Sequence, residues 1–224
     1  DQVELSLMRS GEHEVARAYV LYREKRAKER QQNDLKTDSE DSSQIKISID
    51  GKVKPLDRDF FSGIVETACS GYEDFVNPSH ILDSAFKNIY DGIQFEEVLK
   101  SLILSARTLI EKDPAYAKVS AQLLLYSIRK EVLGHDAQTS EMQKTYEEYF
   151  PRFIEKGITK NLLDPELAKF DITKLSSHIV SSRDHMFEYL GIQTLYDRYF
   201  LIDRKDKVNK EGRRLELPQI FFMR

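Results

Sequence analysis

The sequence predicts a mostly α-helical protein in which a small β-hairpin precedes about four helices, and a second hairpin follows a further helical region. Apolar side chains recur every three to four residues over most of the chain, which is the period of amphipathic helices. Residues 45–49 instead alternate apolar and polar side chains, and Asp50-Gly51 follows at the position of a tight turn. A second pair of short strands is predicted at 199–203 and 213–217, on either side of a charged loop.

The composition is that of an ordinary globular protein. Hydrophobic residues make up 40% and charged residues 32% of the 224 residues, so enough apolar surface is available for a core. The net charge of −4 gives no field that would attract nucleic acid or acidic lipids. No apolar run approaches the roughly 20 residues that cross a bilayer. We therefore expect neither a nucleic-acid partner nor a membrane partner.

Cys69 is the only cysteine of the sequence. A single thiol cannot form an internal disulfide, and it cannot build a cysteine-rich zinc site. A reducing cytoplasm is therefore the expected location. Because Cys69 lies on the apolar face of a predicted helix, we interpret it as a core residue and not as a nucleophile.

The first 44 residues divide into a helical part and a linker. Residues 1–30 have helical spacing, and residues 31–44 are almost wholly polar, so they cannot fold alone and mark a boundary. The charged run 23–30 permits two interpretations, a solvated helix end or a nucleic-acid patch. Interleaved glutamates and the lack of aromatic side chains favour the solvated helix end.

Four helices are predicted between the linker and Gly134, which is placed as a C-cap. They span residues 58–70, 78–90, 95–112 and 114–133. Further helices are predicted at 139–158 and 176–190, and Pro218 suits the first turn of another helix. The last third shows no apolar core obviously its own. Because the chain opens mid-pattern and closes within a predicted helix, we expect it to be a fragment.

Several stretches resemble parts of one enzyme family. Residues 45–134, with the Asp50-Gly51 turn, the joint at 90–93 and the closing run 125–130, resemble a whole ATP-cone, a nucleotide-sensing module. Residues 3–30 resemble the last third of another ATP-cone. Residues 182–190, 196–201 and 215–224 resemble the N-terminal helical region of the class I ribonucleoside-diphosphate reductase large (alpha) subunit.

The resemblance implies a domain order and a function. The order is the end of a first cone (1–30), a linker (31–44), a second cone (45–134) and a truncated helical region (135–224). The parent would be an oxidoreductase that makes deoxyribonucleotides for DNA synthesis, with its overall activity controlled by the allosteric effectors ATP and dATP. Its implied partners are a radical-generating small subunit and further copies of the large subunit. This fragment would lack the catalytic cysteines and would be inactive alone.

The second cone departs from the family pattern where a triphosphate would bind. Cones usually place a basic pair before the Asp-Gly turn, because cations must meet the phosphate charges. Here those positions hold Ser48 and Ile49. Three further positions that are often polar or basic in the family hold apolar side chains: Phe60, Phe95 and Leu99. We therefore predict that this cone is degenerate and acts as a spacer.

Five basic residues are the remaining nucleotide candidates. Arg129 and Lys130 lie in the closing helix of the second cone, where a basic pair is also common for structural reasons. Arg23, Lys25 and Arg26 lie in the partial first cone, and an exposed helix face is the alternative interpretation of each.

Other chemistry finds little support in the sequence. No phosphate-binding glycine loop is present, and the five histidines are scattered. His178 and His185 would share a helix face, but a metal site needs more ligands. Asp184 or Ser182 is predicted to cap a helix. Two alternatives to a reductase segment stay open, a non-enzymatic nucleotide-sensing cone protein and a purely structural helical interaction module.

Overall fold

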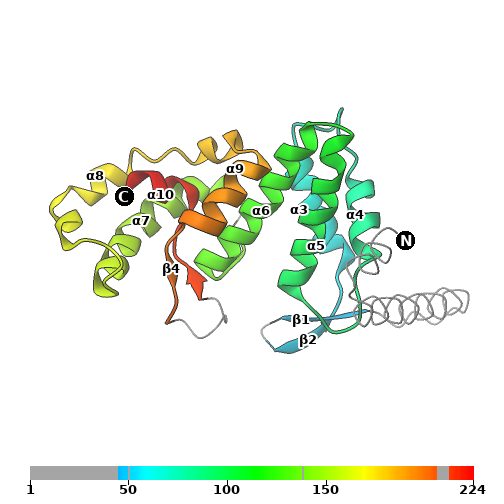
Figure 1. Cartoon of the computed structure of the whole chain (residues 1–224), viewed down its shortest axis with the longest axis horizontal. Helices are drawn as coiled ribbons and strands as arrows, with labels where there is room; N and C mark the ends of the chain where they lie inside the picture. The colour runs from blue at the N-terminus through cyan, green and yellow to red at the C-terminus, as the bar shows by residue number, and fades with distance from the viewer. Residues whose placement is uncertain (1–44, 50, 138, 206–211) are drawn as a thin grey trace, which may run out of the picture. The chain divides into compact units, whose positions relative to one another are not determined.

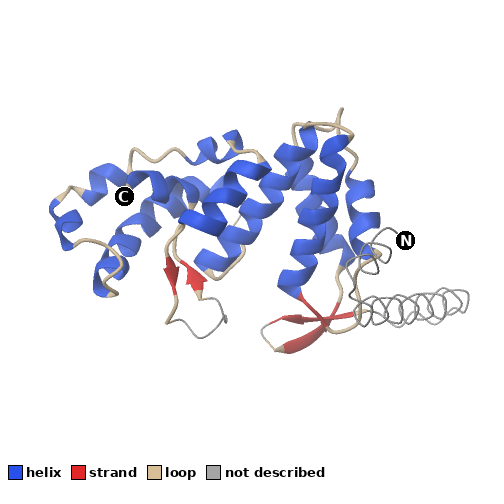
Figure 2. Ribbon diagram, in the orientation of Figure 1, coloured by secondary structure: helices blue, strands red, loops and turns tan. Residues whose placement is uncertain are grey.

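The computed structural model describes residues 45–49, 51–137, 139–205 and 212–224 (Figure 1). The predicted helical segment 1–30 and the linker 31–44 lie outside the described residues. The structure is mostly helical with two small sheets, which confirms the predicted fold class (Figure 2). Residues from Ile45 onward group into a single unit by their contacts. Within the described residues, none of the helices has both the length and the apolar character that a membrane span requires.

The predicted first hairpin forms, and a third strand completes its sheet. Strands β1 (Lys46–Ile49) and β2 (Lys52–Pro55) pair antiparallel around Gly51, whose φ of 76° is the left-handed conformation that glycine adopts without strain. Strand β3 (Ile93–Gln94) pairs parallel to β1, so the strand order is β2-β1-β3. A strand of two residues has no period for sequence analysis to detect.

Four helices follow, close to their predicted ranges. They are α3 (Arg58–Cys69), α4 (Pro78–Phe86), α5 (Phe95–Thr108) and α6 (Ala115–Leu133). Asp57 and Asn77 cap the first two by accepting backbone N–H bonds, and Gln94 begins α5 with a capping box. Gly134 ends α6 with a φ of 79°, as predicted for a C-cap. Helix α4 ends four residues early, and the last turn of the third predicted helix is a 3-10 helix, Leu109–Glu111.

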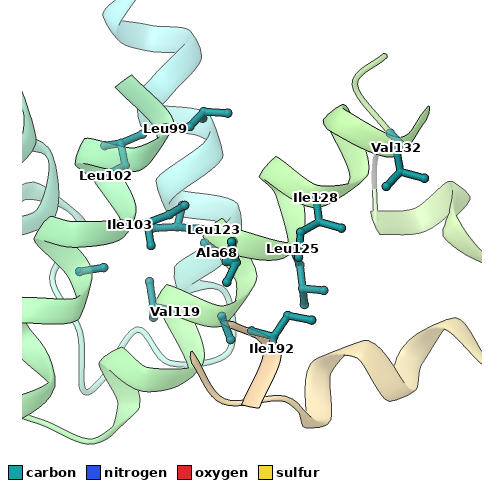
Figure 3. Close-up of a cluster of buried hydrophobic side chains, with 14 of the residues drawn as sticks. Ala68, Leu99, Leu102, Ile103, Val119, Leu123, Leu125, Ile128, Val132 and Ile192 are labelled. Atoms are coloured by element: carbon teal, nitrogen blue, oxygen red, sulfur yellow. The ribbon is translucent and has the colours of Figure 1, made fainter. Parts of the chain in front are cut away.

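Helix α6 is buried around nearly its whole circumference. The three consecutive side chains Leu123, Leu124 and Leu125 are all buried, which a helix with a single apolar face could not achieve. On one side α6 packs against α3 and α5, and on another it packs against α9 (Tyr189–Thr194). Figure 3 shows Ile192 of α9 in one cluster with α6 side chains. The core therefore runs without a break across residue 134.

The region after Gly134 consists of short elements. They are the 3-10 helix η2 (Thr139–Glu141), α7 (Met142–Thr159), η3 (Pro165–Lys169), α8 (Ile172–Ser176), η4 (Ser181–Met186), α9, the π-helix η5 (Leu195–Tyr199), β4 (Ile202–Asp203), β5 (Arg213–Arg214) and α10 (Pro218–Met223). Helix α10 begins at Pro218, as predicted. The second hairpin forms, but its strands have two residues each, since residues 195–199 are helical and not extended.

The prediction of a single helix over residues 176–190 is wrong. Helix α8 ends at Ser176, and the chain then passes through η4 before α9 begins at Tyr189. His178 and His185 therefore do not share a helix face. Tertiary contacts explain why no continuous helix forms here. Asp184 is fully buried and bonded to side chains from three other elements, and this burial outweighs local helical propensity.

Strand β5 attaches the second hairpin to the end of α6. The Arg213 guanidinium donates from Nε to the Glu131 carbonyl (2.7 Å) and from one terminal nitrogen to the Val132 carbonyl (3.2 Å). These carbonyls belong to the last turn of α6 and have no partner within the helix. The Arg214 guanidinium stacks on the Tyr196 ring at 3.5 Å and lies 3.6 Å from the Glu131 carboxylate. Four side chains thus join the last turn of α6 to the later region.

Candidate functional site

In the second cone, the central strand β1 begins with the exposed Lys46, but its end before the turn, where the family places a basic pair, carries no cation. Ser48 and Ile49 are half-buried on β1, and Ile49 packs against the core. Ile47, between Lys46 and Ser48, is buried. The end of β1 before Gly51 therefore offers one hydroxyl and one apolar side chain to any ligand. Neither group can neutralise a phosphate.

Three phenylalanines form a cluster in the helical part of the cone. Phe60 and Phe61 of α3 and Phe95 of α5 lie with ring centroids 5.4–6.2 Å apart. Phe61 and Phe95 are buried, as is Leu99 one turn further along α5, whereas Phe60 is 39% exposed. Such a cluster stabilises the cone by apolar burial and ring contacts. Phe60 and Phe95 thus place apolar rings at two positions that the resemblance expects to be polar or basic.

Lys130 is engaged within the cone. Its Nζ lies 4.0 Å from the centroid of the Phe95 ring and 3.0 Å from Oδ1 of Asp136. Tyr126 donates to the same Asp136 oxygen at 2.6 Å. Burial alone would raise the pKa of Asp136, but the bonds from Tyr126 and Lys130 hold this pKa below its usual value. The charge of Lys130 is thus largely balanced before any ligand arrives.

Arg129 points into a different environment from its neighbour. It is 4% exposed, and its guanidinium lies 3.3 Å from Asp184 Oδ2 and 3.4 Å from Thr139 Oγ1. Its Nε is buried and has no hydrogen-bond partner among the described residues. Consecutive helix positions are about 100° apart, so the pair could not face one ligand without rearrangement. The assignment of Arg129 and Lys130 to a nucleotide site stays a prediction, and Arg23, Lys25 and Arg26 lie outside the described residues.

Asp184 is the centre of a buried polar network that sequence analysis missed. It accepts hydrogen bonds from the Tyr146 hydroxyl at 2.9 Å and from Gln219 Nε2 at 3.0 Å, besides its ion pair with Arg129. Burial, together with the Asp184 carboxylate, raises the pKa of Tyr146 well above its ordinary value. The network joins α6, α7, η4 and α10. Asp184 is therefore not a helix cap; η4 is preceded by Val180, which has no capping side chain.

Cys69 is a core residue, as predicted. It is 1% exposed, and burial, with smaller contributions from Glu73 and Glu66, raises the pKa of its thiol to about 11. A thiol in this state is a poor nucleophile at neutral pH. Across the described residues, no group of three or more His, Cys, Asp or Glu side chains could hold a metal ion.

Comparison with known proteins shows that the chain is similar in sequence to the large subunits of ribonucleotide reductases. No protein-family model matches the chain. The alpha subunit of ribonucleoside-diphosphate reductase from Chlamydia trachomatis is 38% identical to it over 229 residues, covering all of this chain and 21% of that subunit. The alpha subunit from Helicobacter pylori is 35% identical over 178 residues, and the large subunit from Danio rerio is 28% identical over 179 residues; they cover 79% and 80% of this chain.

The chain is therefore homologous, over its whole length, to an N-terminal segment of the ribonucleoside-diphosphate reductase alpha subunit. This confirms the resemblance predicted from the sequence. The chain spans about a fifth of the length of the curated relatives it matches.

Proposed function

We propose that this chain is the regulatory and connecting segment of a ribonucleoside-diphosphate reductase alpha subunit. The observation that carries the proposal is the 38% identity over the whole chain to such a subunit. That match disfavours both a stand-alone cone protein and a general helical interaction module, since neither needs residues 135–224 in this form. The parent reduces ribonucleoside diphosphates to deoxyribonucleotides, in an assembly with further large subunits and with a small subunit that supplies the radical.

We place the chemistry of the reaction outside this segment. Reduction of a ribonucleotide in this family uses reactive cysteines. The only cysteine here, Cys69, is buried, and its pKa of about 11 keeps it protonated at neutral pH. The remaining four-fifths of the parent would therefore hold the catalytic cysteines, the substrate and the specificity effector.

ATP would raise and dATP would suppress the overall activity of the parent. Such control is a linkage effect: each nucleotide stabilises the arrangement of subunits that binds it more tightly. We propose that the upstream cone, to which residues 1–30 contribute, holds the nucleotide through residues that include Arg23, Lys25 and Arg26. The second cone would not bind it. The apolar Ile49 and the phenylalanine cluster of Phe60, Phe61 and Phe95 support this division of roles.

The second cone would then transmit the response through α6. This helix shares its core with α3 and α5 on one side and with α9 on another. The Arg129–Asp184 pair and the Arg213 bonds to the last turn of α6 resist independent motion of the two regions. A shift of the cone would therefore displace α9 and α10 with it, as expected of packed elements.

A chimeric subunit tests the proposal. The homologous fifth of the Chlamydia trachomatis alpha subunit is replaced by this chain, and CDP reduction is measured with the matching small subunit and either ATP or dATP. We expect an active enzyme that dATP still inhibits at least fivefold. A folded chimera that is active but no longer responds to dATP would remove the regulatory role, and a folded, inactive one would remove the connecting role.

A matched variant of the chimera separates transmission from folding. Arg213→Met removes two bonds to the end of α6 and keeps most of the aliphatic stem. We expect dATP inhibition to weaken severalfold while activity with ATP is retained. Lys144→Met, which removes a pair between two exposed side chains of α7, serves as the control and should change neither value.

A further inference from the structure

A cavity of about 750 Å³ lies between α3 and α6, and it is also lined by Asp136, Ala137, Thr139, Ser140 and His185. Its walls are two helical stripes: Phe60, Gly63, Ile64 and Thr67 from α3, and Gln122 and Tyr126 from α6. Residues three and four apart on a helix share a face, so each helix presents one continuous wall. The volume is within the range of small-molecule sites, which is roughly 300–1,000 Å³.

Gly63 leaves part of this space open. It lies in the interior of α3, and a Cβ placed on it would meet no atom within 4 Å. Glycine in a helix interior costs about 0.5–1 kcal/mol relative to alanine. The glycine therefore makes α3 less stable than alanine would, and it leaves the cavity open at position 63. Phe60, next along this wall, is 39% exposed.

The cavity also has polar groups able to bind a ligand. Gln122 carries an amide that both donates and accepts. Arg129 lines the cavity, is 4% exposed, and has a buried Nε without a partner among the described residues. Its other guanidinium bonds are long, at 3.3 and 3.4 Å. A buried donor left unpaired costs about 1–3 kcal/mol, so a ligand oxygen that reached it would be favoured.

The charges of the acidic residues and of Arg129 around the cavity disfavour a phosphate ligand. Arg129 is balanced by Asp184, and Asp136 is balanced by Lys130. The remaining carboxylate, Asp59 in the first turn of α3, adds negative charge at the rim. Without an excess of cations, an anion entering this site would lose its hydration and gain little in return.

We propose that this cavity binds an uncharged planar molecule that carries a carbonyl or amide edge. The ring system lies between Phe60 and Tyr126, and the edge pairs with Gln122 and with the buried, unpartnered Nε of Arg129. The site shares Phe60 with the predicted nucleotide face, but the proposed ligand is uncharged, and the proposal does not depend on the nucleotide role of the cones being correct. Because Arg129 also holds Asp184, a ligand here contacts the network that reaches α7 and α10.

Indole-3-carboxamide is the probe, and indole-3-carboxylate is its charged match. Binding to the full chain is measured by saturation-transfer NMR, with each compound titrated to millimolar concentration. We expect the amide to bind saturably and at least tenfold more tightly than the carboxylate, and ATP not to compete with it. No saturable amide binding, equal binding of the two compounds, or displacement by ATP would overturn the proposal.

Two variants locate the site. Gly63→Leu fills the open space, and Gln122→Leu removes the amide, which is only half-buried. Each should weaken the amide at least tenfold, while Gly63→Ala, as a smaller step, should weaken it less than Gly63→Leu. Thermal melts check that the variants remain folded. Unchanged amide affinity in a folded Gly63→Leu or Gln122→Leu protein would show that the probe binds elsewhere, and it would contradict the proposal.

Discussion

At the scale of single residues, Asp184 carries more of the structure than its sequence context suggests. Its carboxylate is fully buried and receives Arg129, Tyr146 and Gln219 from three different elements. A buried carboxylate is tolerated only when its lone pairs are satisfied, and here several donors share that task. Removing the charge leaves Arg129 buried without a counter-ion.

Asp184→Asn should lower the free energy of unfolding by about 3–5 kcal/mol, the usual cost of breaking one side of a buried ion pair. Chemical denaturation followed by circular dichroism measures this change. Asp197→Asn is the control, because Asp197 is exposed and its side chain accepts a hydrogen bond from Gln193 of the same helical segment, and it should cost less than about 0.5 kcal/mol. Adding Arg129→Met to Asp184→Asn should recover part of the loss. If Asp184→Asn were as mild as the control, the network would not be structural.

Cys69 should react with iodoacetamide only when the protein unfolds. Its raised pKa also gives a sign to the pH dependence. The folded thiol keeps its proton up to about pH 11, whereas an unfolded thiol loses it near 9.0, so this group's contribution to stability is complete below pH 9 and is lost as pH rises toward 11. A pKa difference of two corresponds to about 2.7 kcal/mol. The alkylation rate of Cys69, measured at pH 7–10 with and without urea, tests whether the thiol is protected in the folded protein. Rapid labelling of the native protein at pH 7.5 would contradict the buried placement.

Sequence patterns predicted some site residues and missed others for a physical reason. Ser48 and Ile49 were placed on the cone's central strand by alternation, a local signal that survives folding. Arg129 and Asp184 are 55 positions apart, and no local pattern marks such a pair. Consequently, the sequence predicts a helix cap at Asp184 or Ser182 and indicates no partner for Arg129.

At the scale of elements, local sequence signals predict a helix correctly where the tertiary packing favours the same conformation. The helices between residues 58 and 133 have apolar periodicity and capping side chains such as Asp57 and Asn77, and they form nearly as predicted. The predicted helix 176–190 has a similar period but breaks at η4, because Asp184 turns inward. Local preference decides an element only when no buried long-range contact opposes it.

Two glycines in different backbone conformations should respond to alanine in opposite directions. Gly134→Ala should destabilise the protein by about 1 kcal/mol or more, since its φ is 79° and the new Cβ would lie 3.1 Å from the Arg213 guanidinium. Gly63→Ala should stabilise it by about 0.5–1 kcal/mol, because Gly63 is helical and its Cβ meets open space. Urea midpoints of both variants decide the matter. A stabilising Gly134→Ala would contradict the observed C-cap.

At the scale of the whole molecule, α6 is the element on which both regions depend. Its side chains contribute to a core that extends from α3 and α5 to α9, and its last turn receives Arg213 and Arg214 from the second hairpin. The apparent lack of a separate core in the last third of the sequence follows from this arrangement, because much of that core is supplied by α6. The domain boundary at residue 134 stays a prediction.

Separating the two regions should therefore affect them unequally. We expect residues 45–134 to fold alone, since they keep α6 together with α3, α4 and α5. Residues 135–224 should be less stable, because they lose Arg129, Glu131 and the apolar surface of α6. Thermal melts of the two pieces test this expectation. A cooperative melt at higher temperature for residues 135–224 would contradict it.

The central claim is that the second cone does not bind nucleotide, and calorimetric titration tests it most directly. Residues 45–224, which group as a single unit, are titrated with ATP and with dATP in the presence of Mg²⁺. We expect no saturable heat up to millimolar nucleotide, because Ser48 and Ile49 supply no cation and Lys130 is already paired with Asp136. Saturable binding at micromolar concentration would contradict the claim, and it would make this cone a nucleotide sensor in its own right.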